Sequence, residues 1–229
     1  SALSDGTLRL EFKESWRASG ERVSELLRAG LELARRLTQP ADLALRIASS
    51  LRHEPEPRAR LNALLTLARE YPSHPATRLA LLDAREDESA EVRLRAALAL
   101  GEEGRPTLLT LVTSQTVEDG CAARAVAGLG ERLPEDEVTR ALHSALDSDR
   151  AETAIACLHT LAARPSVKAE AALLVALGAA QSDVRVAAAR ALGRAGSTAA
   201  VRELLTVSES GPGELRTAAR QAIAEIQSR

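Results

Sequence analysis

Residues 91–104 read EVRLRAALALGEEG, and residues 183–196 read DVRVAAARALGRAG. The two stretches begin 92 residues apart and place valine, alanine and leucine at the same spacing of four, followed by glycine. Residues four and eight apart lie on one face of a helix, so each stretch predicts a helix with a small, apolar buried face. The recurrence of the pattern indicates an internal repeat.

The repeat extends to six units when further segments are aligned on the leucine that precedes the glycine in these two stretches; in three of the six units an alanine takes the place of the glycine. These anchors are spaced 29 to 33 residues apart and are Leu67, Leu100, Leu129, Leu161, Leu192 and Ile223. The residue four before each anchor is small: Ala63, Ala96, Ala125, Cys157, Ala188 and Ala219. The glycine after the anchor lies at the C-terminal turn of its helix, where it accepts a left-handed conformation.

A second helical segment precedes each of these helices. We expect these first helices at about 41–53, 74–83, 106–114, 134–146, 166–177 and 198–207, with prolines 40, 75, 106, 134 and 165 near their starts. Polar clusters at 54–57, 86–91, 148–150, 181–183 and 210–214 supply turns and N-caps between the paired helices. Each unit is therefore a helix–turn–helix, and stacked units share a continuous core.

An acidic residue, Val and Arg, followed by alanine-rich residues and Ala-Leu-Gly, resembles HEAT repeats in their short bacterial form. The resemblance covers about residues 38–228, and the segments 70–81 and 219–229 are similar to bacterial HEAT-repeat proteins. The segments 120–133 and 151–164 keep the helix but have Ala122 and Ala154 in the column of the motif's arginine. The resemblance implies an α-solenoid, commonly a protein-binding scaffold, and no chemistry by itself.

The predicted fold is all-α, a right-handed α-solenoid (an α-α superhelix) of about six HEAT-like helical pairs with an N-terminal cap. We expect the cap at 1–37 and the solenoid at 38–229, with repeats at about 38–71, 72–104, 105–133, 134–164, 165–196 and 197–229.

Residues 1–37 do not follow the period of the repeat. The segment 6–13 alternates leucine and phenylalanine with polar residues, which predicts an extended segment or hairpin, although the spacing of Leu8, Phe12 and Trp16 would equally serve a helix. Residues 21–37 are predicted to be helical. This region either covers the core of the first repeat or is the end of an upstream domain.

The candidate binding residues lie on the second helix of each pair, which lines the concave side of a HEAT-like solenoid. Its polar face holds Arg95, Arg124, His159 and Arg190, which suit carboxylates or phosphates of a partner. The alternative is an ordinary solvated helix face.

Two further sets of residues favour a structural role. Arg60, Arg93, Arg185 and Arg216 form a column that we expect to pair with acids between the repeats, such as Asp87 and Asp183; the alternative is an anion-binding ladder. Cys121 and Cys157 occupy apolar columns and are expected to be buried, reduced thiols rather than catalytic ones.

The enzymes known on this fold leave little trace in the sequence. HEAT-type di-iron hydroxylases need several His-Glu pairs, and only His53–Glu54 is present. HEAT-like glycosylases of alkylated DNA use a basic groove with aromatic rings, whereas aromatic residues make up 1% of this chain and its net charge is −2. Nothing discriminates for or against a bilin-lyase-like protein, and phosphate-binding glycine loops are missing. We expect no enzyme, no cofactor and no metal.

The predicted function is a non-enzymatic scaffold or adaptor that binds a protein or peptide along its concave face. The alternative is a nucleic-acid-binding or DNA-base-modifying HEAT-like protein, which the balanced charge disfavours. No apolar run approaches 18 residues, so we expect no membrane span and a cytoplasmic location.

Overall fold

The structure is a computed structural model that describes residues 27–32 and 40–229, with only the backbone for residues 40–42. The chain divides into two compact units, Ser1–Thr77 and Arg78–Arg229. In the part of the chain that the structure describes, every regular element is an α-helix or a short 3-10 helix. The predicted all-α solenoid is confirmed for these residues.

The described residues of the first unit include a helical pair. Helix α2 (Pro40–Leu51) packs against α3 (Pro57–Glu70), so this pair has the helix–turn–helix form of the later repeats. Leu43 and Ile47 of α2 and Leu64 and Leu67 of α3 are buried, so the predicted anchor Leu67 lies in a core. Residues 27–32 are also helical.

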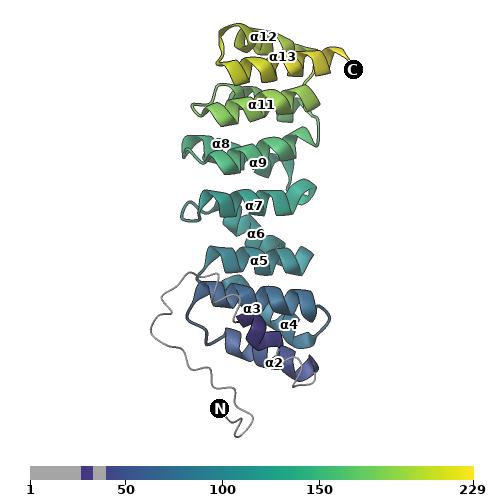
Figure 1. The fold of residues 1–229 in the computed structure, drawn as a ribbon. Helices are drawn as coiled ribbons and strands as arrows, with labels where there is room; N and C mark the ends of the chain where they lie inside the picture. The colour runs from purple at the N-terminus through teal and green to yellow at the C-terminus, as the bar shows by residue number, and fades with distance from the viewer. Residues whose placement is uncertain (1–26, 33–39) are drawn as a thin grey trace. The chain divides into compact units, whose positions relative to one another are not determined.

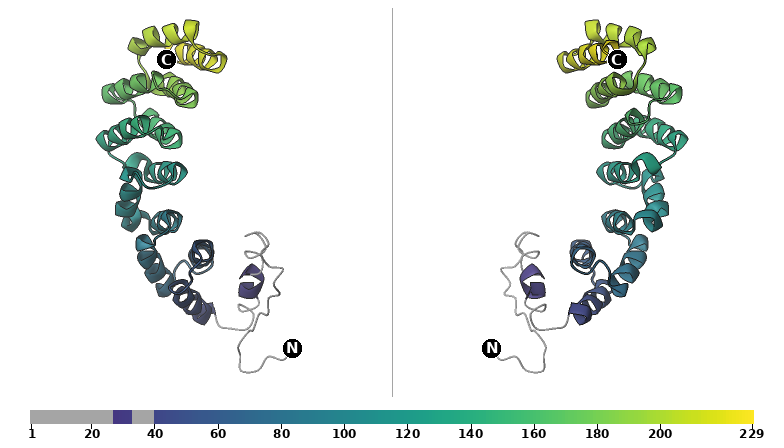
Figure 2. Two further views of the ribbon diagram at one scale, coloured as in Figure 1. Left: turned by 90° about the vertical axis from the view of Figure 1, so that its left-hand side faces the viewer. Right: turned by 90° about the vertical axis from the view of Figure 1, so that its right-hand side faces the viewer.

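The second unit is a stack of helical pairs in two layers (Figures 1 and 2). One layer holds the second helices of the pairs, α5 (Ala90–Leu100), α7 (Asp119–Leu129), α9 (Ala151–Ala162), α11 (Ser182–Ala195) and α13 (Gly213–Gln227). The other holds α6 (Arg105–Thr113), α8 (Glu135–Asp147), α10 (Val167–Leu177) and α12 (Val201–Ser210), while α4 (Pro75–Asp83) runs across the boundary between the units. Each first helix packs on the second helix that follows it, and successive second helices pack on one another.

The core of the second unit follows the predicted columns. In α9, for example, the anchor Leu161 is buried, and so are Cys157, four residues before it, and Thr153, eight residues before it. The anchors Leu100 and Ile223 are only half-buried. Because alanine and cysteine fill the central column, neighbouring helices approach closely without large side chains between them.

The glycine after the anchor has two different roles. Gly101 and Gly130 have φ values of 61° and 49°, so they reverse the chain into the 3-10 turns η3 (Gly101–Gly104) and η4 (Gly130–Arg132) as predicted. Gly193 was expected to do the same, and this prediction is wrong. Helix α11 continues to Ala195, and a Cβ on Gly193 would lie 2.9 Å from the Cα of Ala222 in α13. Gly193 is therefore glycine because two helices touch there.

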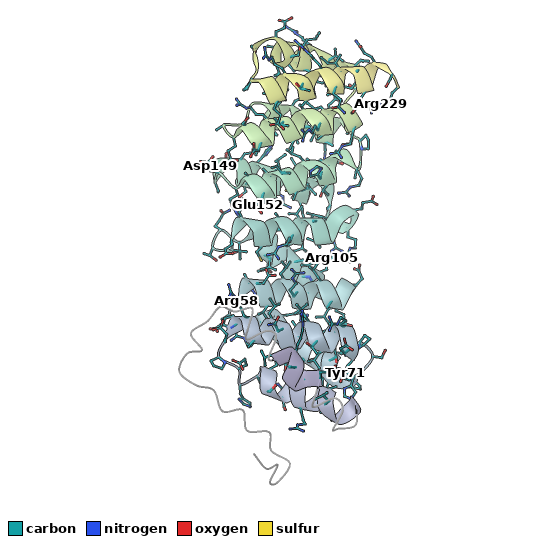
Figure 3. All side chains as sticks on the ribbon, in the orientation of Figure 1. Arg58, Tyr71, Arg105, Asp149, Glu152 and Arg229 are labelled. Carbon is teal, nitrogen blue, oxygen red and sulfur yellow. The ribbon has the colours of Figure 1, made fainter. Side chains whose placement is uncertain are left out.

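Arginines hold the turns of adjacent repeats together through backbone carbonyls. Arg150 donates to the carbonyl oxygens of Ser114 and Val117 at 3.0 and 3.1 Å. Arg229, at the C-terminal end in Figure 3, donates to the carbonyl oxygens of Gly193 and Gly196, both at 2.8 Å. These bonds satisfy acceptors that helix ends leave open and fix the register of one repeat on the next.

Several predictions concern residues outside those described. The extended segment or hairpin expected at 6–13 lies outside the described residues, and of the helix predicted at 21–37 only 27–32 are described. The N-terminal cap at 1–37, the boundary at residue 38 and the exact repeat limits stay predictions.

Candidate functional site: the groove between α7 and α9

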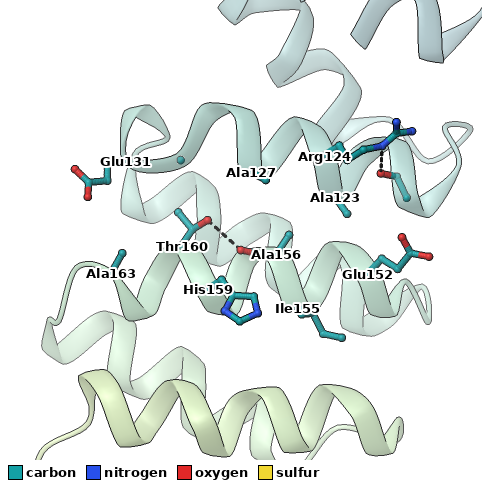
Figure 4. Close-up of a pocket in the computed structure, with 12 residues that line it drawn as sticks. Ala123, Arg124, Ala127, Glu131, Glu152, Ile155, Ala156, His159, Thr160 and Ala163 are labelled. Carbon is teal, nitrogen blue, oxygen red and sulfur yellow. Dashed lines mark hydrogen bonds between the residues drawn. The ribbon is translucent and has the colours of Figure 1, made fainter. Parts of the chain in front are cut away.

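A groove of about 830 Å³ lies on the second-helix layer, between α7 and α9 (Figure 4). We refer to it as the α7–α9 groove. Its lining comprises Gly120, Ala123, Arg124, Ala127, Gly130, Glu131, Glu152, Ile155, Ala156, His159, Thr160 and Ala163. Two of the four predicted binding residues, Arg124 and His159, therefore lie in one groove.

The groove exists because the facing side chains are small. Ala123 and Ala127 of α7 oppose Ala156 of α9, with Ile155 and Ala163 completing an apolar floor. Thr160 is buried and its hydroxyl donates to the carbonyl oxygen of Ala156 at 3.0 Å, so it presents little free polarity. The remaining polar groups, which belong to Arg124, Glu131, Glu152 and His159, lie around this floor (Figure 4).

Arg124 is bound to the chain through all three of its nitrogens. Its two terminal nitrogens donate to the carboxylate of Glu91 on α5, with one contact at 2.9 Å, and its Nε donates to the carbonyl oxygen of Gly120 at 3.1 Å. The bidentate pair links two repeats. Arg124 is thus a repeat-to-repeat contact at the edge of the groove.

Arg95 shares the same carboxylate. Its Nε donates to Glu91 Oε1 at 2.9 Å, one helical turn along α5. Burial raises the pKa of Glu91, but the hydrogen bonds from Arg124 and Arg95 outweigh it and hold that pKa below its usual value. Glu91, Arg95 and Arg124 therefore form one charged cluster across α5 and α7.

His159 contacts an arginine rather than an acid. Its Nδ1 accepts a hydrogen bond from Arg194 of α11 at 2.9 Å, which requires the neutral ring. Burial, and then the positive charge of Arg194, lower the pKa of His159. His159 is thus an uncharged lining group of the groove at neutral pH.

Arg190 lies outside the α7–α9 groove. It pairs with Glu214 of α13 at 3.3 Å, and both side chains are well exposed. The four predicted residues therefore separate into a pair in the groove, one residue joined to it through Glu91, and one on the next repeats. Their role in binding a partner stays a prediction.

The structural column of arginines contacts the backbone of the turns. Arg93 donates to the backbone carbonyl oxygens of Asp87 and Glu88 at 2.6 and 3.0 Å, and Arg60 donates to those of Glu54 and Pro55. At these two positions the turn before the helix directs its carbonyl groups toward the guanidinium. The pairing of this column with inter-repeat carboxylates stays a prediction.

Sequence reasoning missed Asp119, which closes the start of the next second helix. Its carboxylate accepts from the backbone nitrogens of Glu152 and Thr153 at 2.8 and 3.0 Å and from Thr153 Oγ1 at 2.6 Å. The N-cap residue of α9, Arg150, makes no side-chain cap bond of its own. The predicted cap from residues 148–150 is therefore supplied by the preceding repeat instead, and no local pattern marks it.

Sequence reasoning also passed over the two acids of the groove. Glu152 and Glu131 occupy the columns nine before and two after their anchors, on the polar face already singled out, but only its arginines and histidine were weighed. Within the described residues, both carboxylates are exposed and neither makes a hydrogen bond or ion pair. The sequence places both glutamates on the polar face, but it does not show that their carboxylates are left without a partner among the described residues.

The cysteines lie in the core as predicted. Cys121 and Cys157 are buried and free. Burial raises the pKa of both thiols, that of Cys157 to about 12. Neither is poised as a nucleophile.

The described residues contain neither a cluster of metal ligands nor a helix that could span a membrane. In residues 27–32 and 40–229, no three His, Cys, Asp or Glu side chains come together as a metal site. The same part of the chain has no helix that is both long enough and apolar enough to cross a bilayer. The cytoplasmic location stays a prediction.

The described residues form a helical repeat fold. Residues 139–224 match the family model described as HEAT repeats, so the resemblance to HEAT repeats seen in the sequence is confirmed.

Two solved structures align with this chain, and the first of them is similar in fold. The crystal structure of an engineered protein is similar, with 22% identity and a TM-score of 0.51 over 81% of this chain and 96% of that one. Human deoxyhypusine hydroxylase in complex with glycerol aligns at 15% identity and a TM-score of 0.36, over 83% of this chain and 98% of that one. No curated protein sequence matches.

Proposed function

We propose that this protein is a non-enzymatic scaffold that binds a peptide segment of another protein along the second-helix layer, in the α7–α9 groove. The observation that carries the proposal is the groove itself, about 830 Å³ with an alanine-rich floor and charged groups around it. Ligand sites are typically concave and mostly apolar with a few polar groups that fix orientation. Both helices of the groove pack directly on each other, so the site is built on rigid elements.

The nucleic-acid alternative finds less support. A polyanion needs a run of available cations. Arg95, Arg124 and Arg190 each pair with a carboxylate of this chain, which offsets part of the positive charge that a phosphate would meet.

The test blocks the groove with one side chain. Ala127 is exposed on α7 within the groove, and Ala171 is exposed on α10 in the opposite layer. Peptides are selected from a displayed random library on the wild-type protein, and their Kd values are measured by fluorescence polarisation. We expect Ala127→Trp to weaken binding at least tenfold and the matched control Ala171→Trp to leave it unchanged.

Folding of both variants is checked by circular dichroism and thermal unfolding. Failure to enrich any peptide would refute the proposal. So would a set of peptides whose binding Ala171→Trp weakens as much as Ala127→Trp does.

A further inference from the structure

We propose that the α7–α9 groove takes a basic peptide, whose apolar side chains lie on the alanine floor and whose Lys or Arg side chains reach Glu152 and Glu131. This inference rests on the proposed function and gives its partner a chemistry. It reverses the sign expected from the sequence, where Arg95, Arg124, His159 and Arg190 pointed to an acidic partner.

The cations of this face are already engaged. Arg124 uses Nε and both terminal nitrogens on Gly120 and Glu91, and Arg95 shares Glu91. Each terminal nitrogen of Arg124 keeps one N–H that Glu91 does not use, so an acidic ligand could bind Arg124 only beside the Glu91 carboxylate, which would repel it.

The carboxylates in the groove are not engaged in this way. The hydrogen bond to Glu91 is the main cause that raises the pKa of Arg124, and the charge of Glu152 acts in the same direction. Arg124 donates its hydrogen bonds to Gly120 and Glu91 and none to Glu152. Glu131 accepts a bond from Arg164 through its backbone oxygen at 3.1 Å, and the other terminal nitrogen of Arg164 donates to the carbonyl oxygen of Leu133. Both carboxylates therefore remain open to a ligand among the described residues.

The lining has a net negative charge, because one positive group, Arg124, stands against Glu131 and Glu152. His159 adds no charge to the lining, because its Nδ1 accepts a hydrogen bond from Arg194 at 2.9 Å and burial lowers its pKa. The polar groups that remain in the lining, beside Arg124, are two negative charges. A ligand that presents positive charge at both ends meets complementary potential.

The separation of the acids sets the length of the ligand. Glu152 reaches Gly120, since a Cβ there would lie 2.8 Å from Glu152 Oε2. Gly120 and Leu129, the last residue of α7, are nine residues apart, which at 1.5 Å per residue is about 14 Å, and Glu131 lies two residues beyond in η4. An extended chain covers that span in roughly five residues. The fitting peptide therefore carries two basic residues separated by about five positions, with apolar residues between them.

The test compares synthetic peptides that share an apolar core of alternating leucine and alanine and differ only in their flanks: lysine, glutamine or glutamate. Binding is measured by fluorescence polarisation to the wild-type protein and to Glu131→Gln/Glu152→Gln. The matched control is Glu203→Gln/Glu209→Gln, which removes two exposed carboxylates of α12 in the other layer.

We expect the lysine-flanked peptide to bind the wild type most tightly. The groove variant should lose about tenfold of that affinity, roughly threefold for each exposed pair. The loss should shrink as salt is raised, because exposed pairs are screened. The control variant should bind as the wild type does.

Tighter binding of the glutamate-flanked peptide, or equal binding by the groove and control variants, would overturn the inference. If the charge of the peptide flanks made no difference but Ala127→Trp still abolished binding, the groove would remain the binding site and only the basic chemistry of its ligand would be refuted. If Ala127→Trp changed nothing, both proposals would fall together.

Discussion

Replacing Asp119 by alanine should loosen the contact between the third and fourth second-helices, α7 and α9. The Asp119 carboxylate holds the backbone nitrogens of Glu152 and Thr153 and the hydroxyl of Thr153. It also lies 3.7 Å from Arg150. Because Arg150 provides no side-chain cap, Asp119 is what satisfies the first turn of α9.

The cost follows from which donors water can reach. The side chain of Glu152 is exposed, so after the substitution its backbone N–H can turn to solvent at little cost. Thr153 is 1% exposed, so its N–H is left without a partner, which costs about 2 kcal/mol. In a domain of this size such a loss lowers Tm by about 4–8 °C. Asp119→Asn keeps one acceptor oxygen and should lose about half as much.

The measurement is thermal and urea unfolding of the variants, with amide hydrogen exchange at Thr153 to show that the loss is local. Glu118→Ala is the matched control, since Glu118 is the adjacent exposed carboxylate at the same helix end and makes no side-chain cap bond. If Asp119→Ala and Glu118→Ala unfold at the same temperature, or if Thr153 exchanges no faster in Asp119→Ala, the reasoning is refuted.

Three further outcomes follow from contacts in the second unit. Gly193→Ala should lower the free energy of unfolding by about 1 kcal/mol, because the new Cβ would overlap α13 and this outweighs the gain in helix propensity. Gly213→Ala, whose Cβ would meet open space, should not lower it. The midpoints of urea unfolding of the two variants test this. In an NMR titration, the pKa of His159 should lie below 6.5 and rise in Arg194→Gln. Because the histidine of the unfolded chain has the higher pKa, it is protonated first as pH falls. His159 should therefore lower the stability of the fold as pH falls below about 6.5. An unshifted titration of His159 would contradict this. Cys157, with a pKa of about 12, should resist iodoacetamide at pH 8 until the protein is unfolded, and rapid labelling of the native state would show otherwise.

The fold was predictable because stacking repeats the same requirement in every unit. Ala96, Ala125 and Ala188 are each buried at the position that the period assigns them, and Gly101 and Gly130 have the positive φ that their column predicts. Gly193 shows where a column misleads. The residue after the anchor is again glycine, but α11 continues three residues past its anchor Leu192. Gly193 therefore allows a close contact between helices and does not form a turn.

The candidate site was predictable only in part, because its character depends on contacts between repeats. The columns placed Arg124 and His159 on a shared face, and both line the groove. No spacing within a repeat could show that Glu91, 33 residues before Arg124, occupies its guanidinium. Asp119 escaped notice for the same reason, since the helix it caps belongs to the next repeat.

The charge of a solenoid face is therefore a property of pairs of neighbouring repeats rather than of residues. On this face Glu91 binds two arginines at once, so Arg124 and the Nε of Arg95 are already paired within the chain. The same stacking leaves Glu152 beside Gly120, where the missing side chain makes room for a carboxylate but provides no donor to it. Gly120 and Glu91 thus set the charge of the groove together, although neither would be chosen from the sequence as a recognition residue. Substituting Glu91 should therefore change which peptides bind more than substituting Arg95 does, because Glu91 pairs with both cations.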